Sequence, residues 1–290
     1  IEQLEVVEEF RPKFAIIAGG RPDQAASFEA KWIATYLHVP SPAMLDLFLR
    51  EGARRFVFEG RECGGHVGPR TSFVLWESMI RVLVDAGLSP SERAKVHLLF
   101  AGGIHDAVSG AIVSALTQPL VELGMNVGVL IGTAYLFTKE AVECGAILQQ
   151  FQNVAVGTDH TVLFETGPGH LIRCAESDYL AFFENEKRRL KADKRSHEEI
   201  RATLERLNVG RLRIASKGID RRVDAPAGDD PYVPVSGVEQ LRQGMYMLGQ
   251  VACLRDQVCT IRQLHEEVCE GAVAKLREVR PVVDVVEKRC

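Results

Sequence analysis

The sequence has few of the features that mark a metal-binding, membrane or nucleic-acid-binding protein. Its seven cysteines are scattered, with no Cys-x-x-Cys pair and no Cys/His spacing suited to zinc. Glu122 and Asn126 interrupt the richest apolar region, so no run is long enough to cross a membrane. The net charge of −4 provides no general attraction to nucleic acid. Because dispersed thiols fit a reducing compartment, we expect a cytoplasmic location.

Short apolar segments alternate with helical segments in the first half of the 290-residue chain. The segments span residues 14–18, 32–38, 55–59, 96–101 and 127–131. Strands that are apolar throughout and separated by helices predict a parallel sheet covered on both faces. No Gly-x-Gly-x-x-Gly follows the first strand, which disfavours a Rossmann domain. Repeated glycines at the strand ends favour a TIM (β/α)8 barrel, an α/β fold.

A barrel needs eight βα units, but only five precede Gly145. We therefore expect residues 1–150 to be the C-terminal part of a barrel, with the other units upstream of Ile1. Residues 151–290 are predicted to form a mainly helical extension. Its predicted parts are weak strands at 161–164 and 211–214, a turn cluster at 165–170, a charged helical region at 178–207, a Pro/Gly/Asp loop at 224–234 and amphipathic helices over 238–273. In the first half, a helix from Asp106 towards Leu116 is expected, with Pro119 disturbing its far end.

The densest motif runs from Phe56 to Gly68 and reads FVFEGRECGGHVG. Glycine at 64, 65 and 68 removes side chains, so a flat ligand could lie against bare backbone. His66 is the titratable group of this hollow. By itself the stretch is about as well explained by a glycine-rich turn carrying a solvated histidine.

Two later glycine turns end consecutive predicted strands. Gly102-Gly103 and Gly132-Thr133 each place free backbone N–H groups before a helix. Such N–H groups bind phosphate, and the loops after the last two strands do so in many barrels. The pair therefore predicts an anion site, whereas each turn alone would be ordinary.

Taken together, the runs EGRECGGHVG, LLFAGGI and IGTAYLFTKEA resemble the superfamily of nitronate monooxygenases and FMN-dependent enoyl reductases. The family's Glu-x-Gly-Gly-His-x-Gly strand end matches this chain from Glu62 to Gly68. The segments 164–170 and 211–218, and GMYMLGQVACLR at 244–255, are similar to the enoyl-reductase proteins of polyunsaturated fatty acid and polyketide synthases.

This resemblance implies an FMN-binding TIM barrel that reduces a trans-2-enoyl thioester with NADPH, or NADH. The thioester would be carried on an acyl carrier protein, with other synthase domains as partners. His66 would be the catalytic residue, as an acid, a base or a hydrogen-bond donor. The residues implied to contact FMN are Gly19, Gly20, Glu62, Gly64, Gly65, Gly102, Gly103, Gly132 and Thr133.

Several alternatives stay open at this point. A nitronate monooxygenase using O2 would share the FMN and His66, and a non-catalytic synthase scaffold would need neither. The basic stretch from Lys187 to Arg195 is either a solvated helix face or a docking surface for an acidic carrier protein. His170 is expected at a pocket rim, and His105 at a helix start. The helices from Val238 onward either cover the barrel base or form a homodimer interface.

Overall fold

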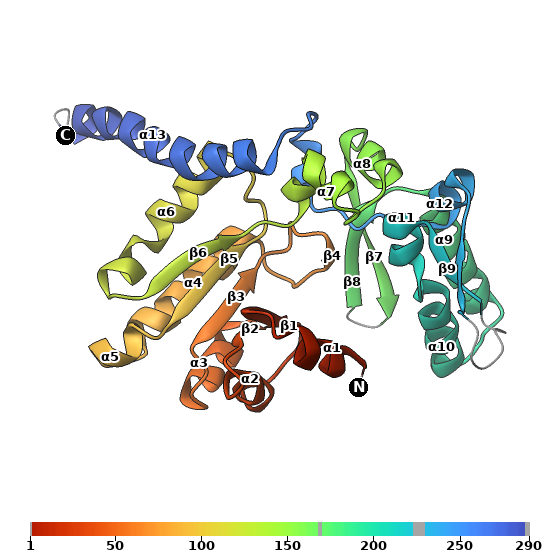
Figure 1. Ribbon diagram of the computed structural model, residues 1–290, viewed down its shortest axis with the longest axis horizontal. Coiled ribbons are helices and arrows are strands. Elements are labelled where there is room, and N and C mark those ends of the chain that lie inside the picture. Colours follow the sequence, from red (N-terminus) through yellow and green to blue (C-terminus); the bar gives the residue numbers. More distant parts are fainter. Residues whose placement is uncertain (1, 168–169, 223–229, 288–290) are drawn as a thin grey trace. The chain divides into compact units, whose positions relative to one another are not determined.

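The computed structural model describes residues 2–167, 170–222 and 230–287, and the chain divides into two compact units (Figure 1). Unit 1 consists of residues 1–61, 68–130 and 271–290, and unit 2 of residues 62–67 and 131–270. The boundary near residue 150 that the sequence suggests stays a prediction.

The sheet of unit 1 has five parallel strands in the order β1-β2-β3-β5-β6 (Figure 1). These are β1 (Phe14–Ile17), β2 (Ala34–His38), β3 (Arg55–Glu59), β5 (His97–Ala101) and β6 (Asn126–Leu130). Their order in the sheet follows their order in the chain, as successive βα units require. The phenylalanines Phe56, Phe58 and Phe100 are fully buried in it. The predicted α/β class with five parallel strands is confirmed.

One helix precedes the strands of unit 1 and the others join them. They are α1 (Glu2–Phe10), α2 (Pro22–Glu29), α3 (Pro42–Arg50), α4 (Ser72–Asp85), α5 (Pro90–Arg93) and α6 (Ala107–Glu122). Asp106 begins α6 as predicted, because its Oδ1 accepts a hydrogen bond of 2.8 Å from the backbone N–H of Ser109. The expectation that Pro119 would disturb the end of this helix is wrong, since α6 continues to Glu122. Burial of Leu120, the next residue, offsets the one hydrogen bond that proline cannot donate.

Unit 2 contains a three-stranded antiparallel sheet in the order β4-β8-β7. Its strands are β4 (Gly65–His66), β7 (Thr161–Gly167) and β8 (His170–Ala175), and a second pair comprises β9 (Ile219–Arg221) and β10 (Tyr232–Pro234). The helical segments are η1 (Thr133–Phe137), α7 (Lys139–Glu143), α8 (Gln149–Val156), α9 (Asp178–Ala192), α10 (His197–Asn208), α11 (Arg211–Lys217), α12 (Gly237–Gln243) and η2 (Gln250–Cys253). Helix α13 (Ile261–Glu287) contributes to both units. The helical character predicted for the C-terminal part is confirmed.

Several local predictions in unit 2 need correction. Residues 211–214, expected as a weak strand, lie in α11, which begins after Gly210 in a left-handed conformation. Of the predicted turn cluster at 165–170, residues 165–167 end β7 and His170 begins β8, while residues 168–169 lie outside the described residues. The amphipathic region 238–273 is not continuous helix, because residues 244–249 are neither helix nor strand. Of the predicted loop at 224–234, residues 224–229 lie outside the described residues, and 232–234 form β10.

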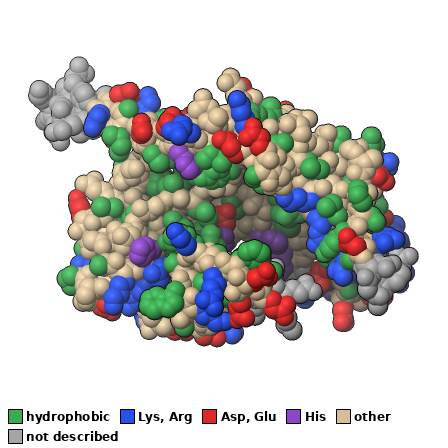
Figure 2. Space-filling model, viewed as in Figure 1, with side chains coloured by type: hydrophobic (Ala, Val, Ile, Leu, Met, Phe, Trp, Pro, Cys, Tyr) green, Lys and Arg blue, Asp and Glu red, His purple; other side chains and the backbone are tan. Residues whose placement is uncertain are grey.

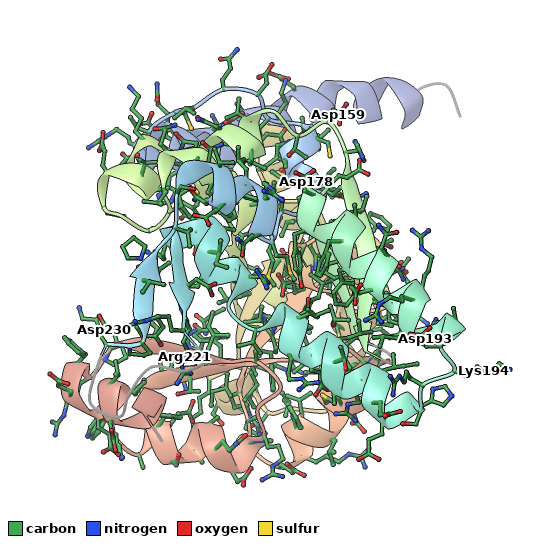
Figure 3. The ribbon with its side chains drawn as sticks, turned by 90° about the vertical axis from the view of Figure 1, so that its right-hand side faces the viewer. Asp159, Asp178, Asp193, Lys194, Arg221 and Asp230 are labelled. Carbon is green, nitrogen blue, oxygen red and sulfur yellow. The ribbon has the colours of Figure 1, made fainter. Side chains whose placement is uncertain are left out.

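The sheet of unit 2 packs against its charged helices through aromatic side chains. Phe164 on β7 meets Phe183 on α9 edge to face, with ring centroids 5.4 Å apart. Asp178 and Asp193, labelled in Figure 3, stand at the two ends of α9. None of the helices in the described ranges is long and apolar enough to span a membrane.

Candidate functional site

Backbone pairing with β8 holds the histidine of the glycine-rich motif in place. In β4, Gly65 lies opposite Arg173 and His66 opposite Ile172, and the N–H of Val67 donates to the Leu171 carbonyl at 3.0 Å. Gly65 has φ +79°, which an L side chain rarely adopts. The His66 side chain is exposed. The motif therefore exposes one imidazole on β4, a short strand that is hydrogen-bonded to β8.

Position 64 requires glycine because of close packing, which the sequence motif alone did not reveal. A Cβ there would lie 2.7 Å from the nitrogen of Gly249 and 2.8 Å from the carbonyl carbon of Leu248. The backbone of residues 248–249 thus occupies the side of Gly64 that a Cβ would need. The bare backbone expected to face a flat ligand faces another stretch of the same chain on that side. GMYMLGQVACLR, which includes Gly249, is the sequence signal for this contact.

Residues 249–250 also bring together, within unit 2, three residues that were predicted to contact FMN: Glu62, Gly64 and Thr133. The N–H of Gln250 donates to the Glu62 carbonyl at 2.8 Å, and the N–H of Gly249 donates to Thr133 Oγ1 at 2.8 Å. A Cβ at Gly249 would lie within 3.0 Å of Glu62, Gly64 and Thr133 atoms. Gly132 precedes η1 and has open space where a Cβ would be.

A cavity of about 840 Å³ opens in unit 2 beside His66. The imidazole of His170 also lines it, and the two rings meet edge to face with centroids 6.5 Å apart. The buried side chains of Ile172 and Met245 belong to its apolar lining.

The charged residues that line this cavity are Arg201, Glu205, Arg213 and Lys217. Lys and Arg side chains gather around α9 to α11 (Figure 2). The cavity is therefore apolar in part and positively charged overall, and His170 lies where a pocket-rim residue was expected.

The remaining predicted glycines follow strands β1 and β5 of unit 1. Gly19 has φ +67° and Gly103 has φ +77°, and neither has an atom within 4 Å of where a Cβ would be. Gly20 and Gly102 are instead closely packed. A Cβ would lie 2.4 Å from the side chain of Ile17 at Gly20, and 2.6 Å from Ser72 Oγ at Gly102.

Ser72 and Gly60 are two further residues at this edge that sequence reasoning did not single out. Ser72 Oγ donates to the Gly102 carbonyl at 3.1 Å, and the Gly60 N–H donates to the Ala101 carbonyl at 3.0 Å. A Cβ at Gly60 would clash with the Ser72 backbone. Gly60 follows β3 as Gly102 follows β5, so its place at a strand end was the available signal.

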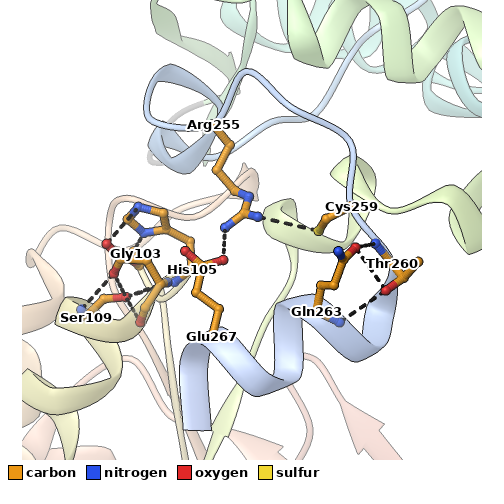
Figure 4. A network of polar contacts seen from close by, with 9 residues as sticks. Gly103, His105, Ser109, Arg255, Cys259, Thr260, Gln263 and Glu267 are labelled. Carbon is orange, nitrogen blue, oxygen red and sulfur yellow. Dashed lines mark hydrogen bonds and ion pairs between the residues drawn. The ribbon is translucent and has the colours of Figure 1, made fainter. Parts of the chain in front are cut away.

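Two polar clusters near helix starts are drawn in Figure 4, one from each unit. In unit 1, His105 Nδ1 lies 3.0 Å from the Gly103 carbonyl, as expected for a residue at a helix start. In unit 2, the Arg255 guanidinium donates to Glu267 at 3.0 Å and to Cys259 Sγ at 3.5 Å. In the ranges that the structure describes, no three His, Cys, Asp or Glu side chains are grouped as metal ligands.

No family model and no curated protein matches this chain. Solved structures do match. FabK from Thermotoga maritima is 21% identical with a TM-score of 0.67, and the match covers 96% of this chain and 73% of that one. The enoyl reductase domain of MlnA, from the macrolactin cluster of Bacillus amyloliquefaciens, is 10% identical with a TM-score of 0.62, covering 97% and 80%. Nitroalkane oxidase from Streptomyces ansochromogenes is 16% identical with a TM-score of 0.58, covering 97% and 68%. The resemblance indicated by the motifs is confirmed in the fold.

Proposed function

We propose that this protein is an FMN-dependent enoyl reductase that reduces a trans-2-enoyl thioester with NADPH. The observation that carries the proposal is the match of nearly the whole chain to FabK, an enoyl-acyl carrier protein reductase, and to the enoyl reductase domain of MlnA. The exposed imidazole of His66 beside a substrate-sized cavity supports it. The pathway would be polyunsaturated fatty acid or polyketide synthesis in the cytoplasm.

The glycine edge of unit 1 suits a phosphate-bearing flavin. Gly19 and Gly103 follow parallel strands, and open space surrounds the position that a Cβ would take at each. Backbone N–H groups can therefore approach an anion without hindrance from a side chain. We assign Gly102 and Gly103 of unit 1 to the phosphate. When bound, FMN would carry hydride from NADPH to the β-carbon of the enoyl thioester.

His66 would act on the thioester. An imidazole N–H that donates to the thioester carbonyl stabilises the negative charge that develops there when the β-carbon accepts hydride. The same group could deliver the proton that the α-carbon takes up, so that one hydride and one proton saturate the double bond. Hydrogen bonding of β4 to β8 keeps the position of His66 constant during either role.

The basic helices of unit 2 would meet the partner. The Lys187 ammonium is held by the Glu165 carboxylate at 3.3 Å, whereas Arg188, Lys191 and Lys194 are exposed on α9 and just after it. Such a surface attracts an acidic carrier protein and speeds its encounter. Other synthase domains and a second copy of this chain are further proposed partners.

A second candidate function is nitronate oxidation. The match to nitroalkane oxidase favours it, because that structure shares the fold over 97% of this chain. In this reaction His66 would take a proton from the nitroalkane, and O2 would be the oxidant.

The deciding experiment is an anaerobic visible spectrum of the intact protein. NADPH should bleach the flavin absorbance, and crotonyl thioester should restore it. Restoration only by oxygen, with nitroalkane consumed, would favour the monooxygenase. Lack of any flavin spectrum after incubation with FMN would favour a scaffold.

A further inference from the structure

We propose that the cavity of unit 2 binds the phosphopantetheine arm of the thioester, with Arg213 and Lys217 holding its phosphate. This inference rests on the proposed reductase function and names the part of the substrate that the cavity recognises. Phosphopantetheine is the chemistry shared by an acyl carrier protein and coenzyme A.

The charge of the cavity comes from one face of a short helix. Arg213 and Lys217 lie one turn apart on α11, and both line the cavity. In the described part of the chain, neither side chain forms an ion pair with a carboxylate. Arg201, a third cation of the lining, is by contrast neutralised by Glu205 at 2.7 Å. Two uncompensated cations that share one cavity favour an anionic ligand.

The contacts of these two cations keep them in place without cancelling their charge. The Arg213 guanidinium lies over the ring of Tyr232, 4.6 Å from its centroid. Lys217 Nζ donates to the Gly145 carbonyl at 2.5 Å. A guanidinium and an ammonium each retain further N–H donors for phosphate oxygens.

The rest of the lining suits a flexible chain better than a dinucleotide. Ile172 and Met245 are buried, and Met247 adds a further adaptable apolar side chain. Among the described lining residues there is no Phe, Tyr or Trp on which a nucleobase could stack. His66, which we assign to the thioester, lines the same cavity. The arm would therefore place the phosphate and the reacting carbonyl in one continuous space.

The test compares two thioesters that differ only in the phosphate, crotonyl-4′-phosphopantetheine and crotonyl-pantetheine. Wild-type protein should have the lower KM for the phosphorylated one. Arg213→Ala and Lys217→Ala should each raise that KM by about tenfold to a hundredfold, as expected for lost charge-assisted hydrogen bonds. The KM for crotonyl-pantetheine and the kcat for both should stay constant. Arg213→Lys should recover part of the loss.

Arg262→Ala is the matched control, because Arg262 is an exposed cation of unit 2 that does not line this cavity. It should preserve the preference for the phosphorylated thioester. Crotonyl-coenzyme A and a crotonyl-carrier protein then distinguish the two sources of the arm. The source that the protein uses should give the lower KM of the two.

Two outcomes would overturn the inference. One is equal KM values for the two thioesters in wild-type protein. The other is a raised KM for NADPH in the two alanine variants with an unchanged thioester preference, which would assign the cations to the pyridine nucleotide. In either case turnover of crotonyl-pantetheine would leave the reductase function standing. No turnover of any thioester, with flavin bleached by NADPH, would instead remove the reductase function itself.

Discussion

The imidazole rings of His66 and His170 meet edge to face, with ring centroids 6.5 Å apart and ring planes at 89°. They belong to neighbouring antiparallel strands, because His66 pairs with Ile172, two residues after His170. Both side chains are exposed and both line the same cavity. A histidine pair offers two candidates for one chemical role, so substitutions must separate them.

We predict that His66→Ala retains FMN but lowers kcat for enoyl reduction on the order of 100-fold, the effect of losing a general acid or oxyanion donor. Flavin absorbance measures binding, and anaerobic stopped-flow reoxidation by crotonyl thioester measures the chemistry. His170→Ala is the matched control and should change kcat less than about threefold, since rim residues contribute mainly to binding. Equal losses in the two variants would assign the role to the pair, and normal turnover of His66→Ala would exclude His66 from the mechanism.

The glycine at position 64 is predicted to be required for folding stability rather than only for ligand access. Gly64→Ala places a Cβ 2.7 Å from the Gly249 nitrogen, and the hydrogen bond from the Gln250 N–H to the Glu62 carbonyl ties the two backbone segments together. Overpacking of this kind costs about 1–3 kcal/mol. Urea denaturation measures the loss, with the control Gly68→Ala in the same motif. Gly68 has open space around a Cβ, so its variant should unfold near the wild-type midpoint. Equal midpoints for all three proteins would contradict the packing argument.

The sequence predicted the fold of unit 1 well because its signals are local. Each parallel strand is a short apolar run ended by a turn residue, and burial on both sheet faces requires that pattern. The start of α6 is also a local feature, since the Asp106 side chain accepts a hydrogen bond from the N–H of Ser109, only three residues later. Such features need no knowledge of distant residues.

The predictions failed where distant contacts decide the structure. The run Arg211–Ile214 alternates in polarity as a strand would, yet burial of Ile214 and Ala215 in unit 2 makes it helical. The glycine at 64 was interpreted as a ligand surface because its partner, Gly249, lies far along the chain. The contact between the rings of His66 and His170 could not be predicted from the sequence either, since it depends on the register of β4 against β8.

Stability is predicted to fall at alkaline pH because of two buried phenols. Burial raises the pKa of Tyr179 to about 12, and burial does the same for Tyr246, against an ordinary pKa of 10.0. In the unfolded chain these groups lose their protons near pH 10.0, so unfolding releases protons between pH 10.0 and about 12. Their contribution to stability is complete below pH 10.0 and decreases as pH rises through this window.

Urea midpoints measured from pH 8 to pH 11, with tyrosinate absorbance followed in parallel, check this prediction. Tyr179→Phe should lower stability at pH 8 by about 1 kcal/mol, because the hydroxyl donates to the Leu207 carbonyl at 2.9 Å. It should also make the loss of stability between pH 8 and pH 11 smaller. Tyr232→Phe, at an exposed tyrosine, should keep the wild-type decline. A decline that is the same in all three proteins would contradict a role for Tyr179.

The glycine edge of unit 1 gives a prediction for cofactor binding. Gly103 and Gly87 both have positive φ, at +77° and +64°, and both have open space around a Cβ. Replacing either by alanine should therefore impose a similar backbone strain of about 1 kcal/mol. Only Gly103 follows a strand at the edge we assign to the flavin phosphate, so Gly103→Ala should also weaken FMN binding by about tenfold through its new methyl group. Quenching of FMN fluorescence on titration with protein measures the Kd. Gly87→Ala corrects for strain, and an equal Kd for the two variants would mean that the phosphate binds elsewhere.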